Sequence, residues 1–411
     1  MFTSSFSLLD LLERMALSNP NMLYALGFMV FSAGLLVWIG AKRSVVFAAS
    51  GKSEMMNSSD AMKFPLTGSC VLFGLYLAIK FIPKEVLAML LACYLTFISV
   101  ITLSSFFRPY FGANVPLGLL CCAVGGAFFY THHWVLNNVL AFGICIVGIE
   151  AMQLKTYTTS AILLVGLFFY DVFWVFGTDV MVTVAKNIQG PIKLLFPQDI
   201  FGDHEKKSLL GLGDIVIPGF FISQMLRFAL LQYQRKNQGV VAPSLEAIAK
   251  SFNIFSFRQC SYFHVAFVAY ICSLLNTMAV MVFFDAAQPA LLYIVPWLLV
   301  CTFLAAAVRG EVKDLITFDE ESQDAAEARK KEEEEAKKKK KEDTESGSKE
   351  TMIQSLIGGF SELGTLLAQS VLFIFGLEKK DDEKKDGAAV QNGSQNRKSN
   401  RSASPLTKKT Q

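Results

Sequence analysis

The strongest constraint on the fold is a series of long apolar stretches. A helix that crosses a hydrocarbon core of ~30 Å needs roughly 20 apolar residues, and only helices and closed barrels satisfy their backbone polar groups inside a bilayer. Nine segments reach or approach that length: residues 22–40, 64–82, 86–107, 115–130, 135–152, 161–184, 209–231, 263–284 and 289–308. The composition agrees, since 53% of the residues are hydrophobic and 36 are Phe. The sequence therefore predicts an all-α, polytopic membrane protein with nine transmembrane helices.

The distribution of Lys and Arg predicts how these helices are oriented, because basic residues favour cytosolic loops. Residues 1–21 hold Asp10, Glu13 and only Arg14, and they lack the basic region and cleavage site of a signal peptide. The first and seventh connections are basic, with Lys42, Arg43, Lys52 and Lys63, and with Arg235, Lys236, Lys250 and Arg258. We therefore expect a lumenal segment at residues 1–21, a first span retained as a signal anchor, and a cytosolic carboxyl terminus. The sixth connection is the exception, since it places Lys186, Lys193, Lys206 and Lys207 on the predicted lumenal side.

A charged tail, residues 318–411, follows the predicted membrane domain of residues 22–317. Its acidic and basic residues alternate in blocks over residues 327–345, which is typical of a solvated spacer. Residues 352–377 are long enough to span, but their polar residues share one helical face, which favours an amphipathic helix over a tenth span. Lys408 and Lys409, fourth and third from the end, are similar to a dilysine retrieval signal of the endoplasmic reticulum.

One carboxylate lies where hydrocarbon should exclude it. Asp214 belongs to an apolar run over residues 208–231, and a charge at the centre of a membrane helix costs about 2.5–3.5 kcal/mol on insertion scales, so a partner and a function are expected. The candidate partners are Glu150, Asp171, Asp179 and Asp285. At 1.5 Å per residue, Asp171 lies ~12 Å and Asp214 ~9 Å from the same membrane face, whereas the other acids lie near the ends of spans. We therefore expect Asp171 and Asp214 to meet.

Two carboxyls that meet in a low-dielectric site share a proton, because both cannot ionise at low cost. The ionised member can then take a proton from water while the protonated member polarises a carbonyl, as in aspartic proteases. Gly211 and Gly213 permit close backbone approach beside Asp214 or a loosened helix, and Pro218 and Pro289 suit a helix break or a helix start. A helical substrate has to unwind before cleavage, so the enzyme has to pair the backbone groups that are freed.

Two other classes of protein also use buried carboxylates. A proton- or ion-coupled transporter employs intramembrane acids and broken helices, and a non-catalytic scaffold could retain them for packing. The chain shows no internal repeat, which weighs against transport. It also lacks the His-x-x-x-His zinc pair of a metalloprotease, and its eight cysteines lie almost entirely within spans, where packing is the expected role. The sequence predicts no metal, no cofactor and no nucleic-acid partner.

Three short motifs carry a resemblance to a known family. Residues 170–171 (YD), 211–214 (GLGD) and 288–291 (QPAL) match the YD, GxGD and PAL motifs of the intramembrane aspartyl proteases, in the family's order and on the sixth, seventh and ninth predicted spans. The likeness extends over residues 22–318. The chain resembles the signal peptide peptidase branch rather than presenilin, because the connection between Asp171 and Asp214 is too short for presenilin's cleaved loop and the amino terminus is predicted to be lumenal.

The resemblance implies a presenilin-like fold and an enzyme of the endoplasmic reticulum membrane that cuts signal peptides and other type II-oriented membrane segments. It implies that Asp171 and Asp214 are the catalytic pair. Further motif residues would shape the site or hold substrate: Tyr170, Gly211, Leu212, Gly213, Gln288, Pro289, Ala290 and Leu291. The partners would be transmembrane peptide segments and the lipid bilayer, and assembly into homo-oligomers is left open. Asp179, a third acid near Asp171, and the long tail depart from the family pattern.

Overall fold

The computed structural model describes residues 20–50, 54–178, 190–198, 207–237, 245–249, 252–284, 288–319, 366–367 and 369–377. The long helices are α2 (Pro20–Ala49), α3 (Ser58–Phe81), α4 (Lys84–Phe111), α5 (Val115–Thr131), α6 (Trp134–Ala151), α7 (Tyr157–Phe176), α9 (Gly213–Asn237), α11 (Ser261–Phe284) and α12 (Leu291–Val308). Two short helices, α10 (Leu245–Ala249) and α13 (Val312–Ile316), lie outside the spans. In this part of the chain, eight helices are long and apolar enough to cross a membrane, and α5 is shorter, with 17 residues. The predicted polytopic helical membrane protein is confirmed, while the count of nine spans stays a prediction.

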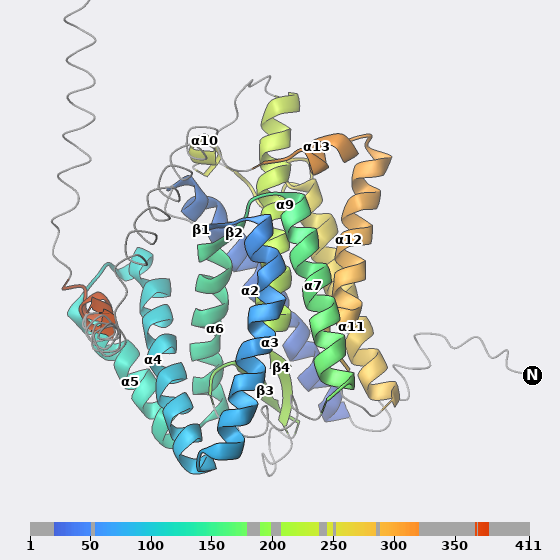
Figure 1. The fold of residues 1–411 in the computed structure, drawn as a ribbon. Coiled ribbons are helices and arrows are strands. Elements are labelled where there is room, and N and C mark those ends of the chain that lie inside the picture. Colours follow the sequence, from blue (N-terminus) through green and yellow to red (C-terminus); the bar gives the residue numbers. More distant parts are fainter. Residues whose placement is uncertain are drawn as a thin grey trace, which may run out of the picture.

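The helices form a bundle with α9 near its centre (Figure 1). In the apolar window of α9, 78% of the residues are buried, against 6% for α3, which therefore lies at the periphery. α9 packs against α2, α6 and α11, and α7 contacts α3, α12 and α9. The bundle thus brings α7 and α9, which carry the two acids predicted to meet, into direct contact.

Two small sheets lie at opposite ends of the bundle (Figure 1). At one end, β1 (Glu54–Met56) pairs in parallel with β2 (Met152–Leu154). At the other end, β3 (Lys193–Pro197) pairs in antiparallel fashion with β4 (Lys207–Gly211). The sequence predicted helices only, and these four strands are a correction to that expectation.

The predicted limits of the sixth and seventh spans are wrong. The seventh was expected to begin at residue 209, but residues 207–211 form β4 and the helix begins only at Gly213. A short apolar run next to a longer one cannot be assigned to strand or helix from its hydrophobicity alone, and here the strand extends the apolar run without a break. In the sixth span, α7 begins at Tyr157, earlier than predicted, and ends at Phe176.

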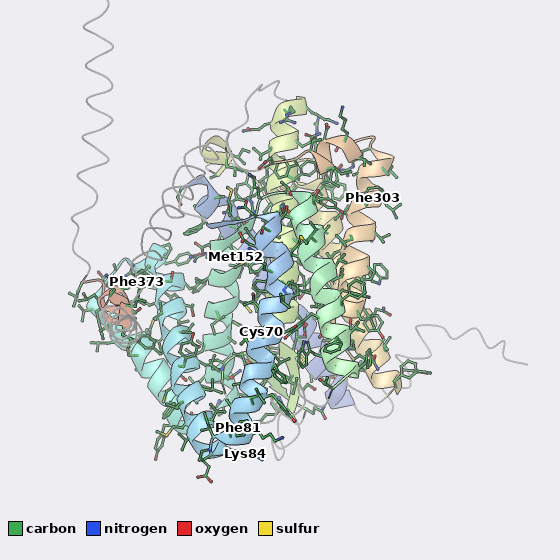
Figure 2. The ribbon with its side chains drawn as sticks, viewed as in Figure 1. Cys70, Phe81, Lys84, Met152, Phe303 and Phe373 are labelled. Atoms are coloured by element: carbon green, nitrogen blue, oxygen red, sulfur yellow. The ribbon has the colours of Figure 1, made fainter. Side chains whose placement is uncertain are left out.

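Large apolar side chains cover the outside of the bundle, as a bilayer environment requires. Phe81 of α3 and Phe303 of α12 are 79% and 45% exposed and project from its surface (Figure 2). All eight cysteines are free thiols. Cys121, Cys145 and Cys260 are buried, in agreement with the packing role expected of the cysteines. Cys70 and Cys93 are exposed and do not have that role.

Residues 369–375 form a short helix beside α4 and α5 (Figure 1). The Ser104 hydroxyl donates a hydrogen bond to the Ile374 carbonyl at 3.4 Å, and the Arg108 guanidinium lies 3.4 Å from the centroid of the Phe373 ring. These residues are the described part of the predicted amphipathic helix at 352–377, so the choice between an interfacial helix and a tenth span stays a prediction. Residues 1–19, Asp179, Asp285, Lys408 and Lys409 lie outside the described residues.

Candidate active site

α7 holds Asp171 in a defined orientation toward the interior of the bundle. The helix is capped by the Thr156 hydroxyl, which accepts a hydrogen bond from the Thr159 N–H at 3.0 Å. Near its other end, the indole N–H of Trp174 donates to the Ser69 hydroxyl of α3 at 3.1 Å. Asp171 lies one turn before Trp174 and is only 7% exposed. The neighbouring Tyr170 is half-buried and faces α3, where its ring lies beside Gly68.

The third motif reaches Asp171 through its backbone. The Leu291 N–H, in the first turn of α12, donates a hydrogen bond to Asp171 Oδ2 at 3.2 Å. Pro289 is buried just before the helix, Ala290 occupies the N-cap position, and Gln288 is half-buried. The N–H groups of a first helical turn have no partner within the helix and carry a partial positive charge. The motif at 288–291 therefore presents the amino-terminal end of α12 to a carboxylate.

The second motif lies at a junction between a strand and a helix. Gly211 ends β4, the Leu212 N–H donates to the Ile192 carbonyl at 3.1 Å, and α9 starts at Gly213 with Asp214 in its first turn. A Cβ atom at Gly211 would lie 3.2 Å from Asp214 Oδ2, so the absence of a side chain there leaves room for the carboxylate. A Cβ atom at Gly213 would meet nothing closer than 3.9 Å. The role expected of both glycines, close backbone approach or a loosened helix, stays a prediction.

The fold brings the two predicted acids together. α7 and α9 pack directly against each other, which places Asp171 and Asp214 on neighbouring helices. Glu150, another candidate partner, instead forms an ion pair with Arg43 at 2.7 Å. We take Asp171, Asp214 and the first turn of α12 as one candidate site, because the Leu291 N–H binds Asp171 and the helices that carry the two acids are in contact.

Tyr270 belongs to this site, and the sequence reading did not identify it. In an α-helix the carbonyl of Asp214 would accept a hydrogen bond from the residue four positions later, but that residue is Pro218, which has no N–H. The hydroxyl of Tyr270 on α11 donates to this carbonyl at 3.0 Å. Tyr270 is fully buried. The proline four residues after an acid was the available signal, since it leaves one backbone acceptor without its usual donor.

Asn137 and Asn138 also support the site and were not singled out in the sequence. Both are buried in the first turns of α6. The Asn138 amide donates to the Leu195 carbonyl at 2.7 Å and accepts from the Leu195 N–H at 2.9 Å, and the Asn137 amide donates to the Lys193 carbonyl at 2.7 Å. These two side chains occupy the outer edge of β3. Partial burial also lowers the pKa of the Lys193 ammonium group, because desolvation disfavours its charged form.

The bonds from these asparagines determine which edge of the small sheet is available. In an antiparallel pair, residues that do not bond across the pair point their backbone groups outward. Lys193 and Leu195 bond outward to α6, so their partners in register, Gly211 and Leu209, also turn their N–H and C=O groups away from β3. Within the described residues no strand covers that edge of β4. Among the described residues, the outward backbone donors and acceptors of the strand that leads into Asp214 have no partner.

Membrane-length helices that carry an acid on each of two helices in contact define a class of protein: an integral membrane protein with two acids inside its helical bundle. Comparisons with known proteins identify the family. The sequence profile described as signal peptide peptidase matches residues 48–116 and 112–322. The chain belongs to the signal peptide peptidase family.

Individual relatives agree with this assignment. Signal peptide peptidase of Mus musculus is 35% identical over 340 residues, which cover 72% of this chain and 84% of that protein. The protein of the same name from Homo sapiens is 35% identical over 339 residues, with the same coverage of both chains. Intramembrane protease 2 of Caenorhabditis elegans is 45% identical over 206 residues, 49% of this chain and 42% of that protein.

Membership of the family makes this chain a multi-pass membrane peptidase. It confirms the resemblance seen in the three motifs and the presenilin-like fold class. It also supports proteolysis within the membrane and gives no support to coupled transport, the alternative that the buried carboxylates had left open.

Proposed function

We propose that this chain is an aspartic-type endopeptidase that cleaves transmembrane peptide segments, with Asp171 and Asp214 as its catalytic pair. The observation that carries the proposal is the contact between α7 and α9, the helices that carry these two acids, at a point where the Leu291 N–H also binds Asp171. A pair of carboxyls in apolar surroundings supplies a base and an acid at one place. The remaining motif residues, Tyr170 and Leu212 among them, would shape the site.

The reaction needs only the pair, one water molecule and the peptide bond. The ionised carboxyl accepts a proton from water, and the water oxygen attacks the carbonyl carbon of the substrate. The protonated carboxyl gives its proton to the carbonyl oxygen, which produces a neutral gem-diol. When the C–N bond breaks, the leaving nitrogen takes the proton that came from water, and a hydroxyl of the gem-diol returns its proton to the second carboxyl. The pair ends with the single proton with which it began.

The free edge of β4 provides a place for the substrate. A helix has to unwind before its peptide bonds can be attacked, and each unpaired backbone group inside a bilayer costs several kcal/mol. An extended segment placed along Leu209 and Gly211 would pair its freed groups with this edge, as peptides do when they add a strand to a sheet. Because Gly211 is three residues before Asp214, such a segment would run directly to the acid pair.

We further propose that the substrates are signal peptides and other type II-oriented segments in the endoplasmic reticulum membrane. The relatives named signal peptide peptidase support this substrate class. Residues 22–317 would form the protease domain, with residues 1–21 in the lumen and residues 318–411 in the cytosol. The basic first and seventh connections support that orientation.

The test is turnover of a synthetic signal peptide by the purified full chain in detergent. Asp171→Asn and Asp214→Asn keep the size of each side chain but remove its acid function, and each should lower kcat at least about 100-fold, the smallest usual contribution of general acid–base catalysis. Asp60→Asn is the matched control, because Asp60 is exposed in the first turn of α3. Cleavage by either active-site variant at the rate of the control would refute the proposed pair.

A further inference from the structure

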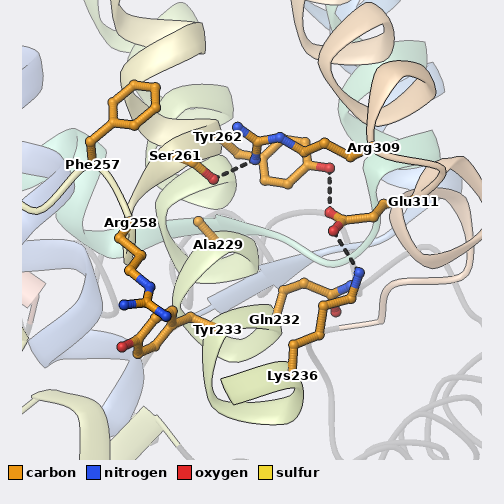
Figure 3. Close-up of a pocket in the computed structure, with 10 residues that line it drawn as sticks. All are labelled: Ala229, Gln232, Tyr233, Lys236, Phe257, Arg258, Ser261, Tyr262, Arg309 and Glu311. Carbon is orange, nitrogen blue, oxygen red and sulfur yellow. Dashed lines mark hydrogen bonds and ion pairs between the residues drawn. The ribbon is translucent and has the colours of Figure 1, made fainter. Parts of the chain in front are cut away.

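A second site lies at the opposite end of α9 from the acid pair. There the end of α9, the beginning of α11 and the end of α12 surround an open cavity of about 580 Å³ (Figure 3). The lining residue of α9 nearest to the active site is Ala229, which lies ~22 Å from Asp214 along the helix at 1.5 Å per residue. The cavity is therefore separate from the site of cleavage.

The cavity is positively charged. Its lining includes Lys236, Arg258 and Arg309 but only one acid, Glu311. Both oxygens of that acid are occupied, since Lys236 forms an ion pair with Glu311 at 2.6 Å and the Tyr262 hydroxyl donates to it at 2.6 Å. The acid is thus neutralised by the lysine, and the charges of the two arginines remain.

Both arginines are placed to receive an anion. Arg309 donates to the Ser261 hydroxyl at 2.5 Å, and its guanidinium lies 4.8 Å from the centroid of the Tyr262 ring. Both contacts are with neutral groups and leave its charge uncompensated. Arg258 is exposed at the rim of the cavity, and among the described residues none forms an ion pair or a hydrogen bond with it (Figure 3). Two guanidinium groups that face one cavity match the oxygens of a phosphate group, which such groups bind in bidentate fashion.

The cavity also lies at the level where helices leave the membrane. α11 begins at Ser261 and α12 ends at Val308, and the connections on this side are those predicted to be cytosolic. Val268 and Leu275, both exposed, follow Ser261 at intervals of seven residues and so share its face of α11. Phe257, at the rim, is 61% exposed. The opening thus has charge at its top and apolar surface beneath it.

From this arrangement we infer that the cavity binds the phosphate headgroup of an anionic membrane lipid. The two arginines contact the phosphate, the hydroxyl groups of Ser261 and Tyr262 line the same space, and the acyl chains lie against the exposed apolar face of α11. Basic pockets between membrane helices on the cytosolic side are typical binding sites for such headgroups. A free phosphate ion shares the charge but has no use for the apolar face, so a lipid is the occupant that uses both parts of the site.

The test uses the full chain in neutral detergent, incubated with phosphatidylglycerol or with phosphatidylcholine of the same acyl chains, and bound lipid is counted by native mass spectrometry. The wild-type protein should retain phosphatidylglycerol at least tenfold better than phosphatidylcholine. Arg258→Gln with Arg309→Gln should abolish that preference. The matched control is Arg235→Gln with Lys313→Gln, which removes the same charge from exposed positions outside the cavity lining and should leave the preference unchanged.

Three results would overturn the inference. Equal losses in the two double variants would mean that the lipid responds to general surface charge. An unchanged preference in the cavity variant would exclude these arginines as the binding groups. Displacement of the lipid by inorganic phosphate at equal concentration would show that the site takes the free ion. Cleavage of a synthetic signal peptide in detergent should persist in the cavity variant, which keeps a failure of this inference distinct from a failure of the proposed proteolysis.

Discussion

Replacing Tyr270 by Phe tests whether a single hydroxyl holds the first turn of α9 in place. The ring is fully buried and Phe preserves its packing, so the variant removes only the hydrogen bond of 3.0 Å to the Asp214 carbonyl. Pro218 provides no N–H to replace it. A buried acceptor left without a partner costs about 1–3 kcal/mol, which is about 5- to 150-fold in an equilibrium or a rate at 1.4 kcal/mol per factor of ten.

That cost should appear in one of two measurements. If the first turn of α9 stays in place, the folded protein carries an unpaired carbonyl and unfolds at a lower temperature. If the turn shifts to find another donor, Asp214 moves with it and kcat falls, because a displacement near 1 Å can cost about 100-fold in rate. Both quantities are therefore measured on the purified variant, thermal unfolding by intrinsic fluorescence and turnover with a synthetic signal peptide.

Tyr157→Phe is the matched control for this experiment. Tyr157 is also buried in the bundle, but its hydroxyl makes only a long contact of 3.4 Å with the Thr302 hydroxyl, which already donates to the Leu298 carbonyl at 2.7 Å. Its removal leaves no backbone group unpaired. If Tyr270→Phe matches the control in both unfolding temperature and kcat, the hydroxyl does not replace the missing N–H and the reasoning fails.

Three further predictions address the flanking glycine, the small sheet and the tail. Gly211→Ala should lower kcat roughly tenfold, because the new Cβ atom would lie 3.2 Å from Asp214 Oδ2 and force that oxygen to move. Gly213→Ala should stay active, because its Cβ atom would meet nothing closer than 3.9 Å. Equal rates for the two variants would contradict this reasoning. Asn138→Leu leaves the N–H and C=O of Leu195 unpaired, so both the unfolding temperature and turnover should fall, and unchanged values would remove this residue from the support of β3. A tag after the last residue should be digested by protease added outside sealed microsomes, and its protection would favour a tenth span.

The helical bundle could be predicted from the sequence because its cause is local. A run of apolar residues that is long enough to cross the bilayer usually forms a transmembrane helix, so the spans can be predicted from hydrophobicity and length. The contact between the helices that carry Asp171 and Asp214 was also predictable, since helices joined by a short connection are usually neighbours. These inferences required no knowledge of which side chains touch.

The strand at residues 207–211 could not be predicted for a different reason. Its apolar residues continue into α9, and nothing in the run itself separates the strand from the helix. What defines the strand is distant in sequence: β3 pairs with it, and Asn138 of α6 holds β3 from the other side. Tyr270 was missed for a similar reason, because the acceptor that it binds is on another helix.

Two of the motifs lie where a helix begins. Gly213 is the first residue of α9, and Pro289 lies just before the start of α12. The amino-terminal end of each helix then lies beside an acid: Asp214 is in the first turn of α9, and Asp171 accepts the first N–H of α12. Each helix start carries about half a positive elementary charge.

An acid pair that shares one proton has one negative charge, and the two helix starts together supply about one positive charge opposite it. No lysine or arginine side chain is then required at the pair, where a fixed cation would hold both acids in the ionised state and remove the proton that the second step of the reaction needs. The N–H groups of a helix start do not titrate, so the positive charge that they supply is the same before and after each proton transfer. In the proposed mechanism, the three motifs would therefore act together although they are separate in sequence: they would stabilise a single shared charge inside the membrane and still leave the second acid protonated.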